Sequence, residues 1–281
     1  MIFSVSESVQ DTLVASKINS GGESDWIMHH VLDSHEFDFA PFGSIPLPHI
    51  SLLGLDISIT KHVVFLWIVA VLLIVAFKIA ANAYKKSLVP HGFTNFMEVM
   101  IIFVRDDIAK PTIGKGYEKF LPYLLTVFFF ILFSNFFGLV PNGSTITSNI
   151  SVTATLAIIA FIVIQGGGMM QNGVFGYFRG LIPGGVPTWL LPIMFIVEIL
   201  GLFTKPFALA VRLFANMTAG HIIIFSLIGL IFILKTYYVA PVSIAFALFI
   251  YLLEILVALI QAYIFTMLTA LFIGMAVHQE H

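Results

Sequence analysis

One residue above all invites a chemical explanation: Arg212, which lies inside a long apolar segment. A guanidinium group stays protonated at ordinary pH, so Arg212 has no neutral form in which to enter a membrane. Placing an arginine at the centre of a bilayer costs roughly 2.5–3.5 kcal/mol on insertion scales. An ionisable residue at this depth indicates a functional site. The alternative is an arginine that reaches the headgroups or forms a structural pair.

Other polar residues recur along the same segment at helical spacing. Glu198, Lys205 and Arg212 are seven residues apart, so a helix would place them on one face with a drift of about 20° per step. Asn216 lies four residues beyond Arg212 and extends that face, whereas His221 lies nine beyond it and falls on the opposite face. A helix here would carry one set of polar residues along the face of Arg212 and a further polar residue, His221, on the opposite face.

A second apolar segment carries Glu254 and Gln261, which are seven residues apart and share a helix face. Glutamate and histidine can take up and release protons, whereas arginine cannot. Titratable groups on different faces, divided by a permanent cation, predict two separate half-pathways for protons rather than one open pore. The alternative is a Glu–His pair that only fastens two helices together.

The composition predicts an all-α protein that crosses the membrane several times. Of the 281 residues, 59% are hydrophobic and only 10% are charged, against about 25% charged in soluble domains. The continuous apolar runs exclude a β-barrel, and a net charge of −2 argues against a nucleic-acid partner. The absence of cysteine excludes disulfides and thiolate metal sites, and no phosphate-binding loop motif indicates nucleotide chemistry. We expect no cofactor and no metal.

Charge divides the chain into two predicted parts. Residues 1–60 are acidic and form an extracytoplasmic segment, and residues 61–281 form the membrane-embedded domain. Three histidines of the first part (His29, His30 and His35) lack the ligand spacing of a metal site, so a solvated loop is favoured. Six cations lie within residues 85–119, which the positive-inside rule places in the cytoplasm. The N-terminus is thus predicted outside and the C-terminus in the cytoplasm.

Hydrophobic segments define the predicted helices. Conventional spans are expected at residues 62–83, 121–140 and 150–164, with an amphipathic surface helix at 93–108 and a tight turn at 141–144. Glycines at 166–168 and 184–185 bracket a predicted flexible cytoplasmic connector.

Two apolar runs, at 190–234 and 242–277, are too long for a simple span. They would measure about 68 Å and 54 Å as helices, whereas the hydrocarbon core is about 30 Å thick. Either the first run breaks near Lys205 and Pro206, or each run is one steeply tilted helix. We favour two long tilted helices in an antiparallel hairpin, with residues 235–240 as the turn.

Two motifs carry a resemblance to a known family. Residues 212–221 (RLFANMTAGH) and 253–265 (LEILVALIQAYIF) resemble subunit a of the rotary F-type ATP synthase. The likeness covers roughly residues 60–277 and is densest from 190 to 277. It implies that the chain conducts protons beside a ring of c-subunits and is held by peripheral-stalk b subunits in the inner membrane. The bacterial plasma membrane is favoured over the mitochondrial one because of the acidic N-terminal segment.

The resemblance also implies roles for single residues. Arg212 corresponds to the family's essential arginine, which faces the ring carboxylates and blocks a proton leak between the half-channels. The other matching positions form a proton inlet (His221, Glu254, Asn216, Gln261 and Asn135) and a proton exit (Glu198 and Lys205). Some members have an aspartate where this chain has Gly138, so the inlet is expected to rely more on His221, Glu254 and water.

Two rival functions remain open from the sequence. A secondary transporter would use the midplane arginine to bind an anionic substrate, but it predicts inverted repeats with paired broken helices, which the sequence does not show. A purely structural scaffold predicts that ion coupling does not depend on Arg212. Sodium remains possible as the transported ion in place of the proton.

Overall fold

The structure is a computed structural model that describes residues 36–38, 44–46, 51–52, 55–56, 60–86, 91–140, 145–180, 187, 189–234 and 238–278. Within residues 60–278, the described secondary structure is helical. Five of these helices are long and apolar enough to cross a membrane. The predicted all-α, multi-pass architecture is confirmed.

The described part of the N-terminal segment consists of two short antiparallel strand pairs. Strand β1 (Glu36–Asp38) pairs with β2 (Ser44–Pro46), and β3 (Ser51–Leu52) pairs with β4 (Leu55–Asp56). Phe37 lies opposite Ile45 in the first pair. The three histidines set aside as metal ligands (His29, His30 and His35) lie outside the described residues.

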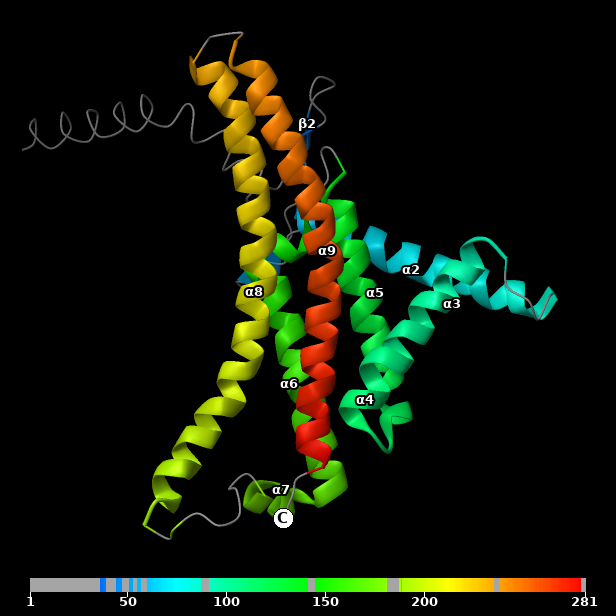
Figure 1. The fold of residues 1–281 in the computed structure, drawn as a ribbon, viewed down its shortest axis with the longest axis vertical. Helices are drawn as coiled ribbons and strands as arrows, with labels where there is room; N and C mark the ends of the chain where they lie inside the picture. Colours follow the sequence, from blue (N-terminus) through cyan, green and yellow to red (C-terminus); the bar gives the residue numbers. More distant parts are fainter. Residues whose placement is uncertain are drawn as a thin grey trace, which may run out of the picture. The chain divides into compact units, whose positions relative to one another are not determined.

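The chain divides into two compact units. One contains Met1–Lys61 and Thr218–Glu254, and the other contains His62–Met217 and Ile255–His281. In the first unit, the end of one long helix and the start of the next run antiparallel (Figure 1). The second unit holds most of the buried apolar core.

Three helices correspond to the predicted conventional spans: α2 (Lys61–Lys86), α5 (Leu121–Gly138) and α6 (Ile150–Asn172). Phe77 of α2 meets Phe129 of α5 edge to face, with ring centroids 5.0 Å apart. A 3₁₀ turn, η3 (Ile146–Ser148), precedes α6 and contacts both α5 and α6. The predicted turn at 141–144 lies outside the described residues.

The expected end of the third span at residue 164 is wrong. Helix α6 continues to Asn172, so the glycines at 166–168 lie inside the helix and not in a connector. The short helix α7 (Val174–Gly180) follows almost at once. The glycines at 184–185 lie outside the described residues.

Close packing, not flexibility, accounts for two of these glycines. A Cβ atom on Gly167 would stand 2.9 Å from the ring of Phe120. One on Gly168 would stand 2.5 Å from the ring of Tyr177 and 2.9 Å from the carbonyl oxygen of Ala276. All three separations are shorter than real Cβ contacts, so only glycine lets α6 approach its neighbours this closely.

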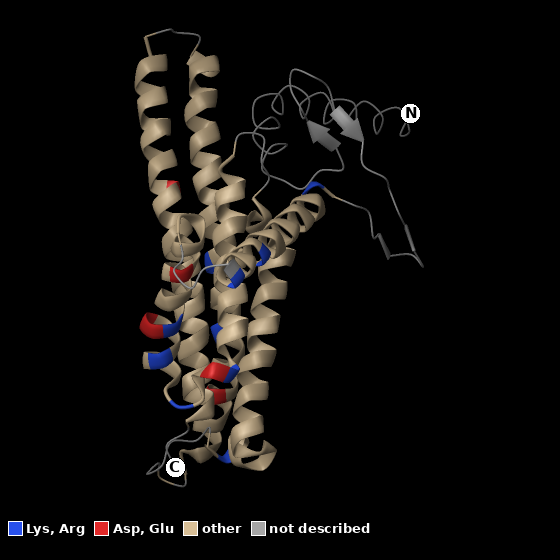
Figure 2. Cartoon of the chain, turned by 90° about the vertical axis from the view of Figure 1, so that its right-hand side faces the viewer, with Lys and Arg blue, Asp and Glu red and all other residues tan. Residues whose placement is uncertain are grey.

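The two long apolar runs form single helices, α8 (Leu191–Leu234) and α9 (Ala240–Val277). Pro206 lies inside α8 without ending it, although proline removes one backbone hydrogen bond from a helix. The expectation of two long helices is confirmed, and their tilt in the membrane remains a prediction. Residues 235–237 of the expected turn lie outside the described part of the chain. Charged residues are sparse along both helices, as the few coloured segments of the cartoon show (Figure 2).

The predicted amphipathic helix exists but has a more complex form. It comprises α3 (Phe93–Phe103), the π-helical turn η1 (Val104–Ala109) and α4 (Lys110–Ile113), with the 3₁₀ turn η2 (Tyr117–Lys119) after it. One face, which includes Met97 and Ile108, is buried in the protein, and η1 packs on α5. Its placement on the membrane surface remains a prediction.

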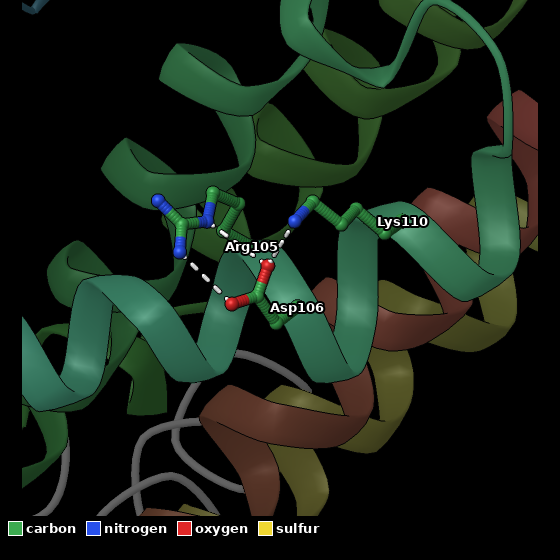
Figure 3. A network of polar contacts seen from close by, with 3 residues as sticks. All are labelled: Arg105, Asp106 and Lys110. Carbon is green, nitrogen blue, oxygen red and sulfur yellow. Dashed lines mark hydrogen bonds and ion pairs between the residues drawn. The ribbon is translucent and has the colours of Figure 1, made fainter.

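An ion network holds the π-helical turn. Asp106 Oδ1 accepts a hydrogen bond from Arg105 Nε at 3.0 Å and also contacts Lys110 Nζ, and Oδ2 accepts one from Arg105 Nη2 at 2.9 Å (Figure 3). The hydrogen bonds from Arg105 and then Lys110 hold the pKa of Asp106 well below its usual range. A depressed carboxyl pKa adds stability above the unfolded pKa, and that stability is lost only in strong acid. The three side chains are 35–45% exposed, so the gain in stability is small.

Candidate functional site

The unit that contains Thr218–Glu254 brings together two predicted site residues. His221 Nδ1 of α8 lies 3.5 Å from Glu254 Oε1 of α9. Glu254 is only 4% exposed, and neither carboxylate oxygen has a hydrogen-bond partner among the described residues. A buried carboxylate without donors is costly, so this pair is suited to taking up and releasing a proton rather than to adding stability.

Gly220 makes room for this carboxylate. A Cβ atom on Gly220 would overlap Oε1 of Glu254 and would stand 2.9 Å from its carboxyl carbon. Glycine inside a helix is less favourable than alanine by about 1 kcal/mol. Sequence reasoning gave Gly220 no role. The signal that could have found it is a helix-interior glycine next to a titratable residue.

Replacing Gly220 with alanine is expected to reduce proton transport several-fold, because the new methyl group displaces the Glu254 carboxylate from His221. The Glu254 side chain must shift to make room, because its carboxyl group is what the new Cβ atom would meet. The measurement is the ATP-driven proton pumping that the resemblance to subunit a of the F-type ATP synthase implies, in membrane vesicles with equal amounts of assembled complex. The matched control is Gly166→Ala in α6, where a Cβ meets no described atom within 4 Å. Equal pumping by the two variants would contradict the packing role of Gly220.

A second pair of predicted residues meets in the other unit. Asn216 Nδ2 of α8 donates a hydrogen bond to Gln261 Oε1 of α9 at 2.8 Å. Gln261 is buried, whereas Asn216 is exposed. The amide pair joins α8 to α9 one helical turn beyond Arg212 and leaves Asn216 accessible from outside the protein.

Arg212 faces away from the packed side of its helix. Its neighbours Leu209, Leu213 and Met217 are buried, while Arg212 is exposed. Within the described part of the chain, Arg212 has no ion-pair or hydrogen-bond partner. The chain presents a permanent cation on an outward face of a membrane helix, without a counter-charge among its own described residues.

Glu198 and Lys205 line one cavity of about 240 Å³. Gln165, Tyr177 and His278 also line it. Lys205 Nζ lies 5.4 Å from the centroid of the Phe272 ring, which fixes the ammonium group over an aromatic face. The two predicted exit residues therefore share a hollow with other polar groups.

Sequence reasoning missed three polar residues of this cavity: Gln165, Tyr177 and His278. Tyr177 donates a hydrogen bond to Gln165 Oε1 at 2.6 Å, and burial raises the pKa of its phenol. Gln165 directly precedes the glycines at 166–168, and Tyr177 lies within the connector that those glycines and the glycines at 184–185 were predicted to bracket, so their packing was not expected. His278 follows the last turn of α9, and only the fold brings it close to Glu198.

Asn135 is fully buried near the end of α5. Its Oδ1 accepts a hydrogen bond from Thr147 Oγ1 at 2.6 Å. Thr145 occupies the space that a side chain at Gly138 would need, because a Cβ there would overlap its hydroxyl group. An aspartate at position 138 would therefore not fit beside Thr145. Among the described residues, no group of three His, Asp or Glu side chains could hold a metal ion.

Comparison with known proteins agrees with these features. The family model for the ATP synthase A chain matches residues 63–274. The chain is 59% identical over 259 residues to ATP synthase subunit a of Chloroherpeton thalassium, covering 90% of this chain and 77% of that protein. It is 53% identical over 229 residues to ATP synthase subunit a of Myxococcus xanthus, covering 81% of this chain and 75% of that protein. The chain belongs to the family of ATP synthase subunit a, and it is a multi-pass membrane protein that takes part in proton transport for ATP synthesis.

Proposed function

We propose that this chain conducts protons through two offset half-channels, and that Arg212 separates them where the chain meets a rotating ring of c-subunits. The observation that carries the proposal is the placement of Arg212 on an exposed face of α8 without a partner among the described residues. A cation at this depth requires a counter-charge. A carboxylate on each ring subunit would supply that charge as it passes.

The side of α8 next to Arg212 supports a close approach by another helix. Ala208 and Ala215 are exposed and lie four residues before and three residues after Arg212. Short side chains allow helix backbones to come close in a membrane, where packing and polar contacts drive association. A ring helix could therefore bring its carboxylate to the guanidinium group.

The polar groups on either side of Arg212 would form the half-channels. Asn216 and His221 follow Arg212 along α8 and meet Gln261 and Glu254 of α9, so these four residues, with Asn135, are proposed as the inlet. Glu198 and Lys205 precede Arg212 and share the cavity of about 240 Å³, which is proposed as the exit. Protons would enter past His221 and Glu254, ride on the ring for nearly a full turn, and leave past Glu198.

Arg212 would make this route obligatory. Because a guanidinium group does not release its proton, it offers no relay between the half-channels, and it favours the ionised form of the facing carboxylate. The electrical part of the driving force is about 2.3 kcal/mol per charge per 100 mV. The chain itself would carry no nucleotide chemistry, and the coupled ATP synthesis would take place on other subunits.

The proposed setting is a bacterial plasma membrane, with the N-terminus outside and the C-terminus in the cytoplasm. The six cations within residues 85–119 support this orientation through the positive-inside rule. The proposed partners are the c-subunit ring, the peripheral-stalk b subunits and membrane lipid. A secondary transporter is less favoured, since α8 runs unbroken through Pro206 and such transporters bind substrate at interrupted helices.

The function is tested by ATP-driven proton pumping, which must depend on Arg212 while ATP hydrolysis by the soluble part of the complex does not. Loss of both activities in an assembled complex, or of neither, would contradict the proposal.

The contact with the ring has a separate test, because the chain has no cysteine of its own. Ala215→Cys is expected to form a disulfide with a cysteine placed beside the carboxylate of a c-subunit, seen as a cross-linked band after oxidation. The matched control is Ala210→Cys, since Ala210 is buried within this chain and should not cross-link. Equal cross-linking at both positions, or none at Ala215→Cys, would contradict this interface.

A further inference from the structure

A chain of buried polar groups lies where α2 begins, α5 ends and α6 begins. His62, in the first turn of α2, is only 2% exposed, and its Nε2 lies 3.5 Å from Ser148 Oγ of η3. A histidine enclosed in this way is a titratable group inside the protein, and the proposed function has so far given it no role.

The polar contacts continue from Ser148 into the protein. Ser148 Oγ donates a hydrogen bond to the carbonyl oxygen of Thr145 at 2.7 Å. The adjoining residue, Thr147, donates to Asn135 Oδ1 at 2.6 Å, and both of these side chains are fully buried. His62 and Ser148 thus form one polar contact, and Thr147 and Asn135 form another. The two contacts are linked because Thr147 and Ser148 are neighbours in η3, and we call the four residues the polar file.

Two donors beside this file lack partners. Asn135 Nδ2 and Ser134 Oγ are buried and make no hydrogen bond to any described residue. Leaving such a group unsatisfied costs about 1–3 kcal/mol, and buried polar groups of proteins are usually paired with protein or with ordered water. An unsatisfied donor at each of positions 134 and 135 therefore indicates that water reaches this end of α5.

We propose that His62, Ser148, Thr147 and Asn135 line a hydrated proton-uptake path, with His62 as the proton-accepting residue at its outer end. The imidazole would take a proton from water on the outer side and release one from its ring to the water beside Ser148 and Asn135. This inference rests on the proposed function, which puts Asn135 in the inlet and the start of α2 on the outer side.

The charge pattern around the path explains why a histidine would matter there. Residues 134–157, which cover the end of α5, η3 and the start of α6, contain no ionisable side chain. On α2 the neighbouring residue is Lys61, and the next charged residue is Lys78. Thr145 fills the place at Gly138 where some family members carry an aspartate. An imidazole ring can accept a proton at one nitrogen and release one from the other, which is the exchange that the path requires.

The first test is His62→Gln in the assembled complex, with ATP synthesis measured in inverted vesicles whose lumen represents the outer side. The variant is expected to synthesise ATP several-fold more slowly and to lose part of the dependence of the rate on lumenal pH. The matched control is His91→Gln, since His91 is exposed and lies in the cation-rich segment. A wild-type rate and pH profile for His62→Gln would overturn the role of His62.

The second test measures water access and does not depend on His62. Ser148→Cys is expected to make ATP-driven pumping sensitive to Ag⁺, which reacts with thiolates in water. Ile158→Cys serves as the control, because Ile158 lies on an exposed apolar face of α6 and its thiol would face lipid. If Ser148→Cys stays insensitive while Arg212→Ala still abolishes pumping, the uptake path is wrong and the proposed function stands. If Arg212→Ala pumps normally, the proposed function itself fails.

Discussion

Replacing Arg212 with alanine is expected to abolish ATP-driven proton pumping in inverted membrane vesicles, while the soluble part of the complex still hydrolyses ATP. Arg212 is exposed on α8 and has no counter-charge among the described residues, so its removal leaves no buried anion of this chain uncompensated. The fold should therefore survive. What is lost is the cation that favours the ionised ring carboxylate and prevents protons from passing directly between the half-channels.

Two further variants separate the charge of Arg212 from its shape. Arg212→Lys keeps a positive charge but loses the planar fork of donors, so partial pumping at most is expected. Arg179→Ala removes an exposed arginine of α7, outside the proposed half-channels, and should pump like the wild type. Each complex must first be shown to assemble and hydrolyse ATP. Normal pumping by Arg212→Ala would mean that the arginine is structural and that the mechanism is wrong.

Much of the fold could be predicted because each membrane helix needs a continuous run of apolar residues, which is visible in the sequence. The apolar runs identified the five long apolar helices of the described residues. Two of the runs exceeded the membrane thickness by enough to predict a pair of unusually long helices. Helical periodicity also placed Glu198 and Lys205 on one face, and both line the same cavity. These features depend on residues that are close in the sequence, so their spacing is enough to predict them.

The errors concern contacts between distant parts of the chain. Glycine has two opposite uses, flexibility and close packing, and only the neighbours decide between them. The glycines at 166–168 were assigned to a connector because nothing in the local sequence indicates that Tyr177 and Ala276 pack against Gly168. For the same reason the sequence did not predict that Thr145 occupies the space next to Gly138, or that Glu254 occupies the space next to Gly220. In both places the position of a distant residue explains why the chain has glycine.

Removing the carboxylate of Glu254 is expected to cut proton flux through the complex by at least about tenfold, because a positioned proton-transfer group typically contributes about 10²–10⁴-fold to a reaction. Glu254→Gln keeps the size of the side chain but cannot exchange protons. His221→Gln should have a similar effect, because His221 is the group 3.5 Å from the carboxylate. The measurement is ATP-driven pumping, with Glu118→Gln as the control, since Glu118 is exposed on η2.

The stronger test of the pair is to exchange its members. If the two side chains act as one relay, His221→Glu combined with Glu254→His should pump better than either substitution alone, since each single change leaves two like groups facing each other. Non-additivity of this kind identifies residues that act together. We expect the double variant to recover only part of the wild-type pumping. The space beside Gly220 holds the carboxylate of Glu254 of α9, and the double variant would place an imidazole there instead. A double variant no better than the single ones, together with normal pumping by Glu254→Gln, would reduce the pair to a fastening between two helices.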